Sequence, residues 1–172
     1  MEVKSNDCRW YAVYTAPRAE KAVSERFSTS GITHYLALQK VKHHWSDRLK
    51  EVMVPVIKGY IFVFIPTIDF NKVTGIYGAI AFVKQGGLPI PIPDQQMQSF
   101  QFMVSHADVP VEYSNEQYEH GETILVNKGP LQGMIGELIE IKGKHIVQIR
   151  LAKFGCALIS IPVSFVERIK QG

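Results

Sequence analysis

The residues best suited to chemistry in this sequence are the cations and the tryptophan of one short segment, KVKHHWSDRLK at residues 40–50. Lys and Arg side chains bind phosphate groups, and an exposed aromatic ring can stack on an unpaired base. The polar pair Ser46-Asp47 predicts that the chain turns back here as a hairpin. Two interpretations stay open: a nucleic-acid contact made by Lys40, Lys42, Arg48 and Lys50, or solvated charges that only block edge pairing of the strands.

Other kinds of chemistry find little support. His43 and His44 are adjacent, and neighbouring strand residues point to opposite faces, so they are poorly placed to share a metal. Cys8 and Cys156 lie far apart and follow no metal-ligand spacing, which favours a reduced, cytoplasmic protein. We find no Ser/His/Asp signature, no P-loop and no dinucleotide-binding fingerprint. We therefore expect no enzyme, no catalytic residue, no cofactor and no metal.

Length and composition bound the fold. With 172 residues, the chain fits one domain or two small ones. A content of 46% hydrophobic and 20% charged residues is ordinary for a globular protein, and a net charge of +3 permits contact with nucleic acid without requiring it. The first 20 residues hold no apolar signal-like region, and no run is long enough to span a bilayer, so we expect no membrane association.

The elements of the first half surround its most apolar stretch, VMVPVIKGYIFVFI at residues 52–65. This stretch predicts a central strand that is entered through a bend at Lys58-Gly59. In chain order, the other patterns predict a strand at 10–14, a helix from Thr15 to Gly31, a strand at 32–45, a short helix and turn at 67–78, a strand at 79–84, and a helix from Asp94 with Met97, Phe100 and Val104 inward. The order β-α-β-β-α-β-α indicates an α+β sandwich.

The second half begins with a change of charge and of residue pattern. Residues 107–119 carry four acidic and no basic side chains, which favours a linker; the alternative is a segment that folds back onto a basic face and competes there with a polyanion. From Gly121 on, short strands alternate with glycine turns, a pattern typical of a small all-β barrel. We therefore predict a first domain at 1–106, an acidic linker at 107–119 and a β-domain at 120–172.

The glycines of this β-domain follow a known pattern. The sequence has a glycine, an apolar strand, a Gly-Pro-apolar-x-Gly segment and a further glycine, and this order resembles a KOW motif. The residues that match are Gly121, Val126, Gly129-Pro130, Leu131, Gly133 and Gly136. Gly129 and Gly133 would relieve the strain of positive φ where the first strands turn. This motif alone implies RNA or the transcription machinery, and no single function.

Three ordered motifs in the first half narrow the resemblance. WYAVYTAPRAEKAV, GYIFVFI and GAIAFVKQGGLPIPI are similar to the N-terminal (NGN) domain of NusG-type transcription elongation factors, and the similarity extends through the KOW domain. It implies an NGN-type α/β sandwich with an antiparallel sheet, followed by an SH3-like β-barrel. The chain most resembles the specialised antiterminator paralogues of the RfaH and UpxY kind, which would act on one operon, such as a surface-polysaccharide operon. The alternatives are a housekeeping NusG-type factor and a ribosome-associated KOW protein that binds RNA.

The resemblance also implies binding surfaces on the first domain. The apolar surface that binds the RNA polymerase clamp helices maps onto Tyr60 and Phe62, flanked by Trp10, Pro55 and Ile57. Lys58 replaces a proline common in the family, and Tyr60 and Phe62 could instead be plain core residues. Contact with non-template or upstream DNA maps onto Arg18, Lys21 and Arg26, whose other interpretation is a solvated helix face. A further polymerase contact is in doubt because the segment at 69–72 reads DFNK.

In the KOW domain, the resemblance implies a binding loop at Phe154-Gly155 for ribosomal protein S10 or the terminator Rho. A turn phenylalanine of the barrel is the alternative interpretation. Because HIVQIRL and CALISI favour strands, we expect a barrel here and not a helical hairpin. We expect the protein to be a monomer.

Overall fold

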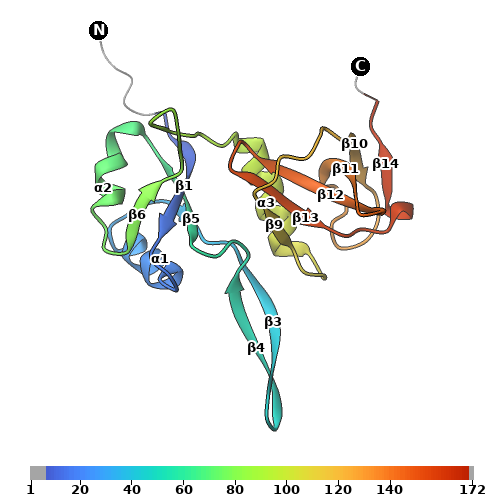
Figure 1. The fold of residues 1–172 in the computed structure, drawn as a ribbon, viewed down its shortest axis with the longest axis horizontal. Helices are drawn as coiled ribbons and strands as arrows, with labels where there is room; N and C mark the ends of the chain where they lie inside the picture. The colour runs from blue at the N-terminus through green and yellow to red at the C-terminus, as the bar shows by residue number, and fades with distance from the viewer. Residues whose placement is uncertain (1–6, 171–172) are drawn as a thin grey trace. The chain divides into compact units, whose positions relative to one another are not determined.

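The computed structural model describes residues 7–170, and the chain divides into two compact units (Figure 1). The first unit comprises Met1–Ala37 and Ile57–Asp94, and the second comprises Leu38–Val56 and Gln95–Gly172. This division assigns the 40–50 hairpin and the helix after Asp94 to the second unit. The boundaries expected from the sequence at 106 and 119 stay a prediction, and each unit is described on its own below.

The first unit is built on a four-stranded sheet in the order β2-β5-β1-β6, with every pair antiparallel. Its strands are β1 (Arg9–Thr15), β2 (His34–Tyr35), β5 (Tyr60–Ile65) and β6 (Ala79–Phe82). A small hairpin of β7 (Lys84–Gln85) and β8 (Leu88–Pro89) follows. Because β5 lies between β2 and β1, the apolar GYIFVFI segment is the inner strand that its composition predicts.

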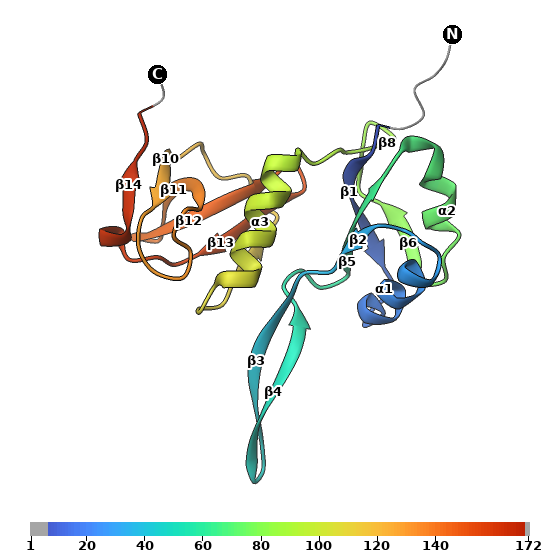
Figure 2. The ribbon, with the colours of Figure 1, turned by 180° about the vertical axis from the view of Figure 1, so that it is seen from behind.

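Two helices cover one face of this sheet (Figure 2). Helix α1 (Glu20–Thr29) buries Val23 and Phe27, and α2 (Phe70–Thr74), preceded by the 3-10 turn η1 (Thr67–Asp69), buries Val73. These side chains share a core with Ile61, Val63 and Ile65 of β5 and with residues of β1 and β6. The helix begins at Glu20 and not at Thr15, which ends β1 as a buried residue. Phe70 of the DFNK segment joins this core, at 5.0 Å from the Tyr11 ring and 4.8 Å from the Phe82 ring.

Residues 52–65 contain parts of two strands, one on each side of the predicted bend. Strand β4 (Arg48–Pro55) ends before a bend and turn at residues 56–59, and β5 starts at Tyr60. The predicted bend at Lys58-Gly59 is present, with Gly59 at φ +84°. Likewise, residues 32–45 form two strands, β2 and β3 (Leu38–Trp45), and β3 pairs with β4 in a separate two-stranded sheet. A run of apolar and β-branched residues does not show where one strand ends and the next begins, so the composition alone locates neither the division between β2 and β3 nor the end of β4.

The second unit contains an antiparallel six-stranded sheet in the order β14-β10-β11-β12-β13-β9. Five of its strands, with the 3-10 turn η2 (Val163–Phe165), form the β-domain that the sequence predicts: β10 (Glu122–Val126), β11 (Ile135–Ile141), β12 (Lys144–Leu151), β13 (Gly155–Ile159) and β14 (Val166–Arg168). Gly129 and Gly133 adopt φ values of +82° and +93°, which confirms the conformation expected from the KOW pattern.

Two elements precede this β-domain in the second unit. Helix α3 (Asp94–His106) buries Met97, Phe100 and Met103; Val104, which we expected to point inward, is only partly buried. The side chain of Gln96 accepts a hydrogen bond from the backbone N–H of Ala152 at 2.6 Å, so the helix is joined to the end of β12. Strand β9 (Glu112–Ser114) lies inside the acidic interval and pairs with Cys156–Leu158 of β13. Within residues 7–170, no helix is long and apolar enough to cross a membrane.

Candidate protein and nucleic-acid interfaces

One face of the first unit's sheet carries a series of aromatic side chains. In the β1–β5 register Trp10 pairs with Phe64, Ala12 with Phe62 and Tyr14 with Tyr60, and directly paired residues share a face. The rings of Trp10 and Phe64 lie 5.1 Å apart, and those of Tyr14 and Tyr60 lie 5.4 Å apart. None of these residues belongs to the core beneath α1 and α2. Alternation along β5 therefore gives one face to the helices and collects the aromatic residues on the other.

Exposure differs along this aromatic face, which we define as Trp10, Tyr14, Tyr60, Phe62 and Phe64. Phe62 is only 1% exposed, Tyr14 is 42% exposed, and the other three are partly buried. Ile57, also predicted to flank a binding surface, is 2% exposed, and Pro55 ends β4 in the second unit. Tyr14 is thus the most accessible residue of the face, and Tyr60 is its cross-strand partner. The sequence prediction missed Tyr14, although the alternation Trp10, Ala12, Tyr14 places it on the same face of the strand as Trp10.

The turn that leads into Tyr60 is held by hydrogen bonds to both the backbone N–H and the backbone carbonyl of Gly59. The backbone N–H of Gly59 donates to the Glu20 carboxylate at 2.7 Å, and its carbonyl accepts from the N–H of Thr15 at 2.8 Å. Glu20 is 7% exposed and stands in the first turn of α1, where a negative charge is favourable. The start of α1 therefore fixes the turn that presents Tyr60.

The three predicted DNA-binding cations near α1 have different surroundings. Arg18 is exposed in the turn before the helix, with φ +60°, and Lys21 is exposed on the helix. Arg26 instead donates to the carbonyl of Tyr77 at 2.8 Å, and its guanidinium lies 5.0 Å from the centre of the Tyr77 ring. Arg26 therefore also holds the turn after α2, and all three cations stay candidate phosphate contacts.

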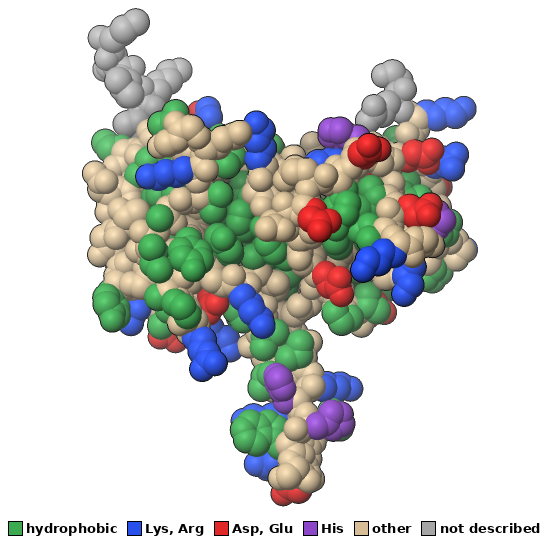
Figure 3. Space-filling model, viewed as in Figure 1, with side chains coloured by type: hydrophobic (Ala, Val, Ile, Leu, Met, Phe, Trp, Pro, Cys, Tyr) green, Lys and Arg blue, Asp and Glu red, His purple; other side chains and the backbone are tan. Residues whose placement is uncertain are grey.

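The β3–β4 hairpin has a two-residue turn, Ser46-Asp47, as predicted, and its cross-strand register sorts the basic residues. Trp45 pairs with Arg48 and His43 with Lys50, whereas His44 pairs with Leu49 and Lys42 with Glu51. Because neighbouring pairs alternate, Trp45, Arg48, His43 and Lys50 share one face. In Figure 3, Lys, Arg and His side chains gather along the hairpin. The two histidines lie on opposite faces, and no group of three His, Cys, Asp or Glu residues in the described chain could hold a metal ion.

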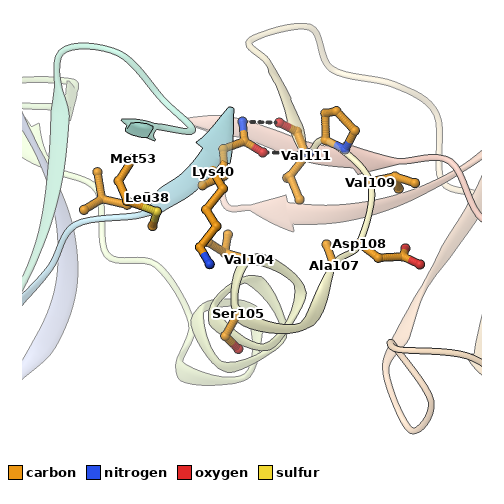
Figure 4. A pocket seen from close by; sticks show the side chains of 11 residues that line it. Leu38, Lys40, Met53, Val104, Ser105, Ala107, Asp108, Val109 and Val111 are labelled. Atoms are coloured by element: carbon orange, nitrogen blue, oxygen red, sulfur yellow. Dashed lines mark hydrogen bonds between the residues drawn. The ribbon is translucent and has the colours of Figure 1, made fainter. Parts of the chain in front are cut away.

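Lys40 stands apart from the other hairpin cations. It lines a pocket of about 490 Å³ together with Leu38, Met53, Val104, Ser105 and residues 107–111, and its side chain points toward Val104 and Ser105 (Figure 4). Beside it, the amide of Gln39 exchanges two hydrogen bonds with the backbone of Val111, at 3.0 and 3.1 Å. The base of the hairpin is therefore anchored to the segment after α3 through Gln39, and Lys40 is an exposed side chain of the pocket beside this anchor.

The predicted KOW binding loop is covered by the chain itself. Phe154 is 8% exposed, its ring stacks on Tyr113 of β9 at 5.0 Å, and its carbonyl accepts a hydrogen bond from the Tyr113 hydroxyl at 2.7 Å. A Cβ atom on Gly155 would collide with the backbone of Ser114 and lie 2.7 Å from the Tyr113 ring. The acidic interval therefore supplies a strand that packs directly on Phe154-Gly155.

A polar cluster that sequence reasoning missed lies on β11 and β12. The Glu137 carboxylate accepts hydrogen bonds from Gln148, from Arg150 at 3.1 Å and from His120 at 3.3 Å. Burial raises the pKa of Glu137. The hydrogen bonds from Arg150, Gln148 and His120, together with the charge of Arg150, lower this pKa by more than burial raises it, so the pKa lies below its ordinary value. Arg150 also donates to the Tyr118 carbonyl at 2.9 Å, which attaches the end of the acidic interval to the β-domain.

Comparisons with known proteins agree with this architecture. A family model described as transcription termination factor nusG matches residues 8–101. The chain is 24% identical over 169 residues to the transcription termination/antitermination protein NusG of Rickettsia felis, covering 90% of this chain and 86% of that protein. It is also similar to a solved structure that describes domain interaction in Thermotoga maritima NusG, with a TM-score of 0.53, 20% identity and coverage of 95% and 98% of the two chains. That last likeness bears on the fold, an NGN-type sandwich followed by a KOW-type β-domain.

Proposed function

Since this chain belongs to the NusG family of transcription termination and antitermination factors, we propose that it binds the clamp helices of RNA polymerase and suppresses pausing or termination. The observation that carries this proposal is the aromatic face of the first unit, on the side of the sheet that α1 and α2 leave uncovered. Tyr and Trp dominate the energetics of protein interfaces because they bury a large area at little cost in conformational entropy. Tyr14 and Tyr60 offer such an area, and Trp10, Phe62 and Phe64 support it from the same face.

The nucleic-acid part of the function uses two basic surfaces. The cations that we assign to contact with the non-template or upstream DNA strand are those of α1 and the turn before it, Arg18, Lys21 and Arg26, and those of the hairpin, Lys40, Lys42, Arg48 and Lys50. A factor that holds both polymerase and DNA would stabilise the closed clamp during elongation. No chemical step is required of it, so its action is binding alone.

We further propose that this is a specialised antiterminator acting on one operon, such as a surface-polysaccharide operon, as its resemblance to RfaH and UpxY proteins suggests. The alternative is a housekeeping factor that couples polymerase to Rho or to the ribosome through S10. Phe154-Gly155 favours the alternative, because the residue pair expected of that contact is present, although β9 packs on it. A ribosome-associated RNA-binding protein would have no use for the aromatic face.

Recruitment to polymerase tests the clamp contact. Phe62 is buried, and replacing it by Ala would remove about 3–5 kcal/mol of stability and confuse loss of binding with unfolding. The sharper variant is therefore Tyr14→Ala with Tyr60→Ala, which changes the most accessible residue of the face and its cross-strand partner. Tyr77→Ala is the matched control, because Tyr77 is 82% exposed in the same unit and lies outside the aromatic face. We expect the double variant to bind core polymerase at least tenfold more weakly and the control to bind normally.

The specialised role needs a second experiment. In single-round transcription through a terminator, the protein should raise read-through on a template that carries its own operon leader, and less on a template without that leader. Equal read-through on both templates would favour the housekeeping role. Undiminished polymerase binding by the Tyr14/Tyr60 double variant would refute the clamp surface.

A further inference from the structure

We propose that the β3–β4 hairpin binds an unpaired nucleic-acid strand on one face only, the face that carries Trp45. This inference rests on the proposed nucleic-acid contact and specifies its ligand class and its residues. It replaces a general basic patch with a defined row of side chains. The Trp45 face consists of Val41, His43, Trp45, Arg48, Lys50 and Val52, and the Lys42 face consists of Lys40, Lys42, His44, Leu49, Glu51 and Met53.

The two faces differ in charge. The Trp45 face carries Arg48 and Lys50 without any acidic residue, and His43 is paired directly with Lys50. On the Lys42 face, Glu51 is paired directly with Lys42, and Lys40 lies at the base of the hairpin in the pocket beside α3. The carboxylate of Asp47 is in the turn and belongs to neither row. A polyanion therefore meets two cations and no carboxylate on the Trp45 face, whereas on the Lys42 face a carboxylate stands directly across from Lys42.

The position of the indole identifies the form of nucleic acid. Trp45 is 62% exposed, although an indole is costly to leave in water. Arg48 is its direct cross-strand partner, so the two Cβ atoms are about 5 Å apart, and His43 lies two residues along the same strand, about 7 Å away. A ring that stacks on a base beside a cation that binds the adjoining phosphate fits an unstacked strand, whereas the bases of a duplex offer no free π-face.

Solvated charges that merely block edge pairing explain these observations less well. Edge protection requires charge on the strands and is indifferent to which face carries it. It gives no reason for an exposed tryptophan, which would itself promote association. The segregation of Trp45, Arg48 and Lys50 from Glu51 is what a binding face requires.

Titration of the full-length protein with a labelled 12-nucleotide single strand, and with the duplex of the same sequence, tests the inference without polymerase. Trp45→Ala should weaken single-strand binding roughly 5- to 100-fold, the range expected for loss of one base–aromatic stack, and should change duplex binding much less. Trp45→Phe keeps a stacking ring and should retain most of the affinity. Because Trp45 is exposed, these variants should keep the thermal midpoint of the parent protein.

A pair of charge-matched variants locates the phosphate contacts. Arg48→Ala/Lys50→Ala removes two cations from the Trp45 face, and Lys40→Ala/Lys42→Ala removes two from the rest of the same hairpin. The first variant should reduce the slope of log affinity against log salt by roughly 1.4, since each phosphate contact to a single strand contributes about 0.7. The second variant should reduce the slope clearly less, because Glu51 stands directly across from Lys42 and Lys40 lies at the base of the hairpin.

Several results would overturn the inference: equal losses from the two charge-matched variants, tighter binding of the duplex, no effect of Trp45→Ala, or no binding of any oligonucleotide. The last result would assign the hairpin to an acidic protein surface. None of these results affects the clamp contact, which is measured with polymerase and with different variants, so failure of one proposal is separable from failure of the other.

Discussion

The hydroxyl of Tyr113 donates a hydrogen bond to the backbone carbonyl of Phe154 at 2.7 Å, and the two rings stack with their centres 5.0 Å apart. Tyr113 is the middle residue of β9, a three-residue strand, and pairs with Ala157 of β13. The acidic interval thus occupies the β13 edge and the Phe154 ring together. A partner that used the same surface would have to displace this strand.

Replacing Gly155 should release β9 from the β-domain. Gly155 has φ +151°, and a methyl group there would collide with the Ser114 backbone and the Tyr113 ring. Gly133 is the matched control, because it also has positive φ, +93°, but nothing lies within 4 Å of its Cβ position. We expect Gly155→Ala to accelerate amide hydrogen exchange at Cys156–Leu158 by tenfold or more, and Gly133→Ala to leave these amides protected. Unchanged exchange in Gly155→Ala would mean that β9 tolerates the added methyl group.

Loss of the Tyr113 contacts should expose the predicted partner site. Tyr113→Phe removes one hydrogen bond, worth about 1 kcal/mol, and keeps the ring stack, whereas Tyr113→Ala removes both. If S10 binds at Phe154-Gly155, its affinity, measured by calorimetric titration, should rise about fivefold in the first variant and more in the second. Combining Tyr113→Ala with Phe154→Ala should abolish the gain. Affinity that falls in Tyr113→Ala would show that β9 itself contacts the partner.

Stability of the second unit should depend on pH through Glu137. The pKa of Glu137 is lowered from its ordinary value of 4.5 in the folded protein, so its contribution is fully present above that value and is lost as pH falls through the folded pKa. Glu137→Gln should therefore reduce stability at neutral pH and flatten the decline below pH 4.5, as measured by hydrogen exchange of the β11 and β12 amides. Glu140→Gln, an exposed carboxylate on the same strand, is the control. An equally steep acid decline in both variants would assign the effect to other carboxylates.

Local chemistry was sufficient to predict many of these elements. The β5 strand follows from β-branched and aromatic composition, the hairpin turn from Ser46-Asp47, and the positive φ at Gly129 and Gly133 from the glycine spacing. Each of these depends on interactions within a few residues, which a sequence pattern records directly. The aromatic face follows from alternation alone, once β5 is known to be a strand.

Features that depend on distant residues were missed. The acidic composition of residues 107–119 predicted a linker, yet β9 forms because the β13 edge and Phe154 offer it a ladder and a stacking ring some 40 residues away. The Glu137 cluster likewise joins groups from three segments that no motif connects. Arg26 looked like its neighbours in the sequence, and only the position of Tyr77 shows that it is already engaged.

The contact between Glu20 and Gly59 should be a main determinant of the first unit's stability. Glu20→Ala removes a charged acceptor from a partly buried N–H and should cost about 1.5–3 kcal/mol, whereas Glu20→Gln keeps an acceptor of similar shape and should cost less. Glu25→Ala changes an exposed residue of the same helix and should stay within about 0.5 kcal/mol of the parent. The free energy of unfolding can be measured by urea titration, with Trp10 fluorescence as the signal. The chain has two tryptophans, so the variants are made in a Trp45→Phe background in which Trp10 is the remaining one. Equal losses in Glu20→Ala and Glu25→Ala would show that the charge on α1 matters and that the bond to Gly59 does not.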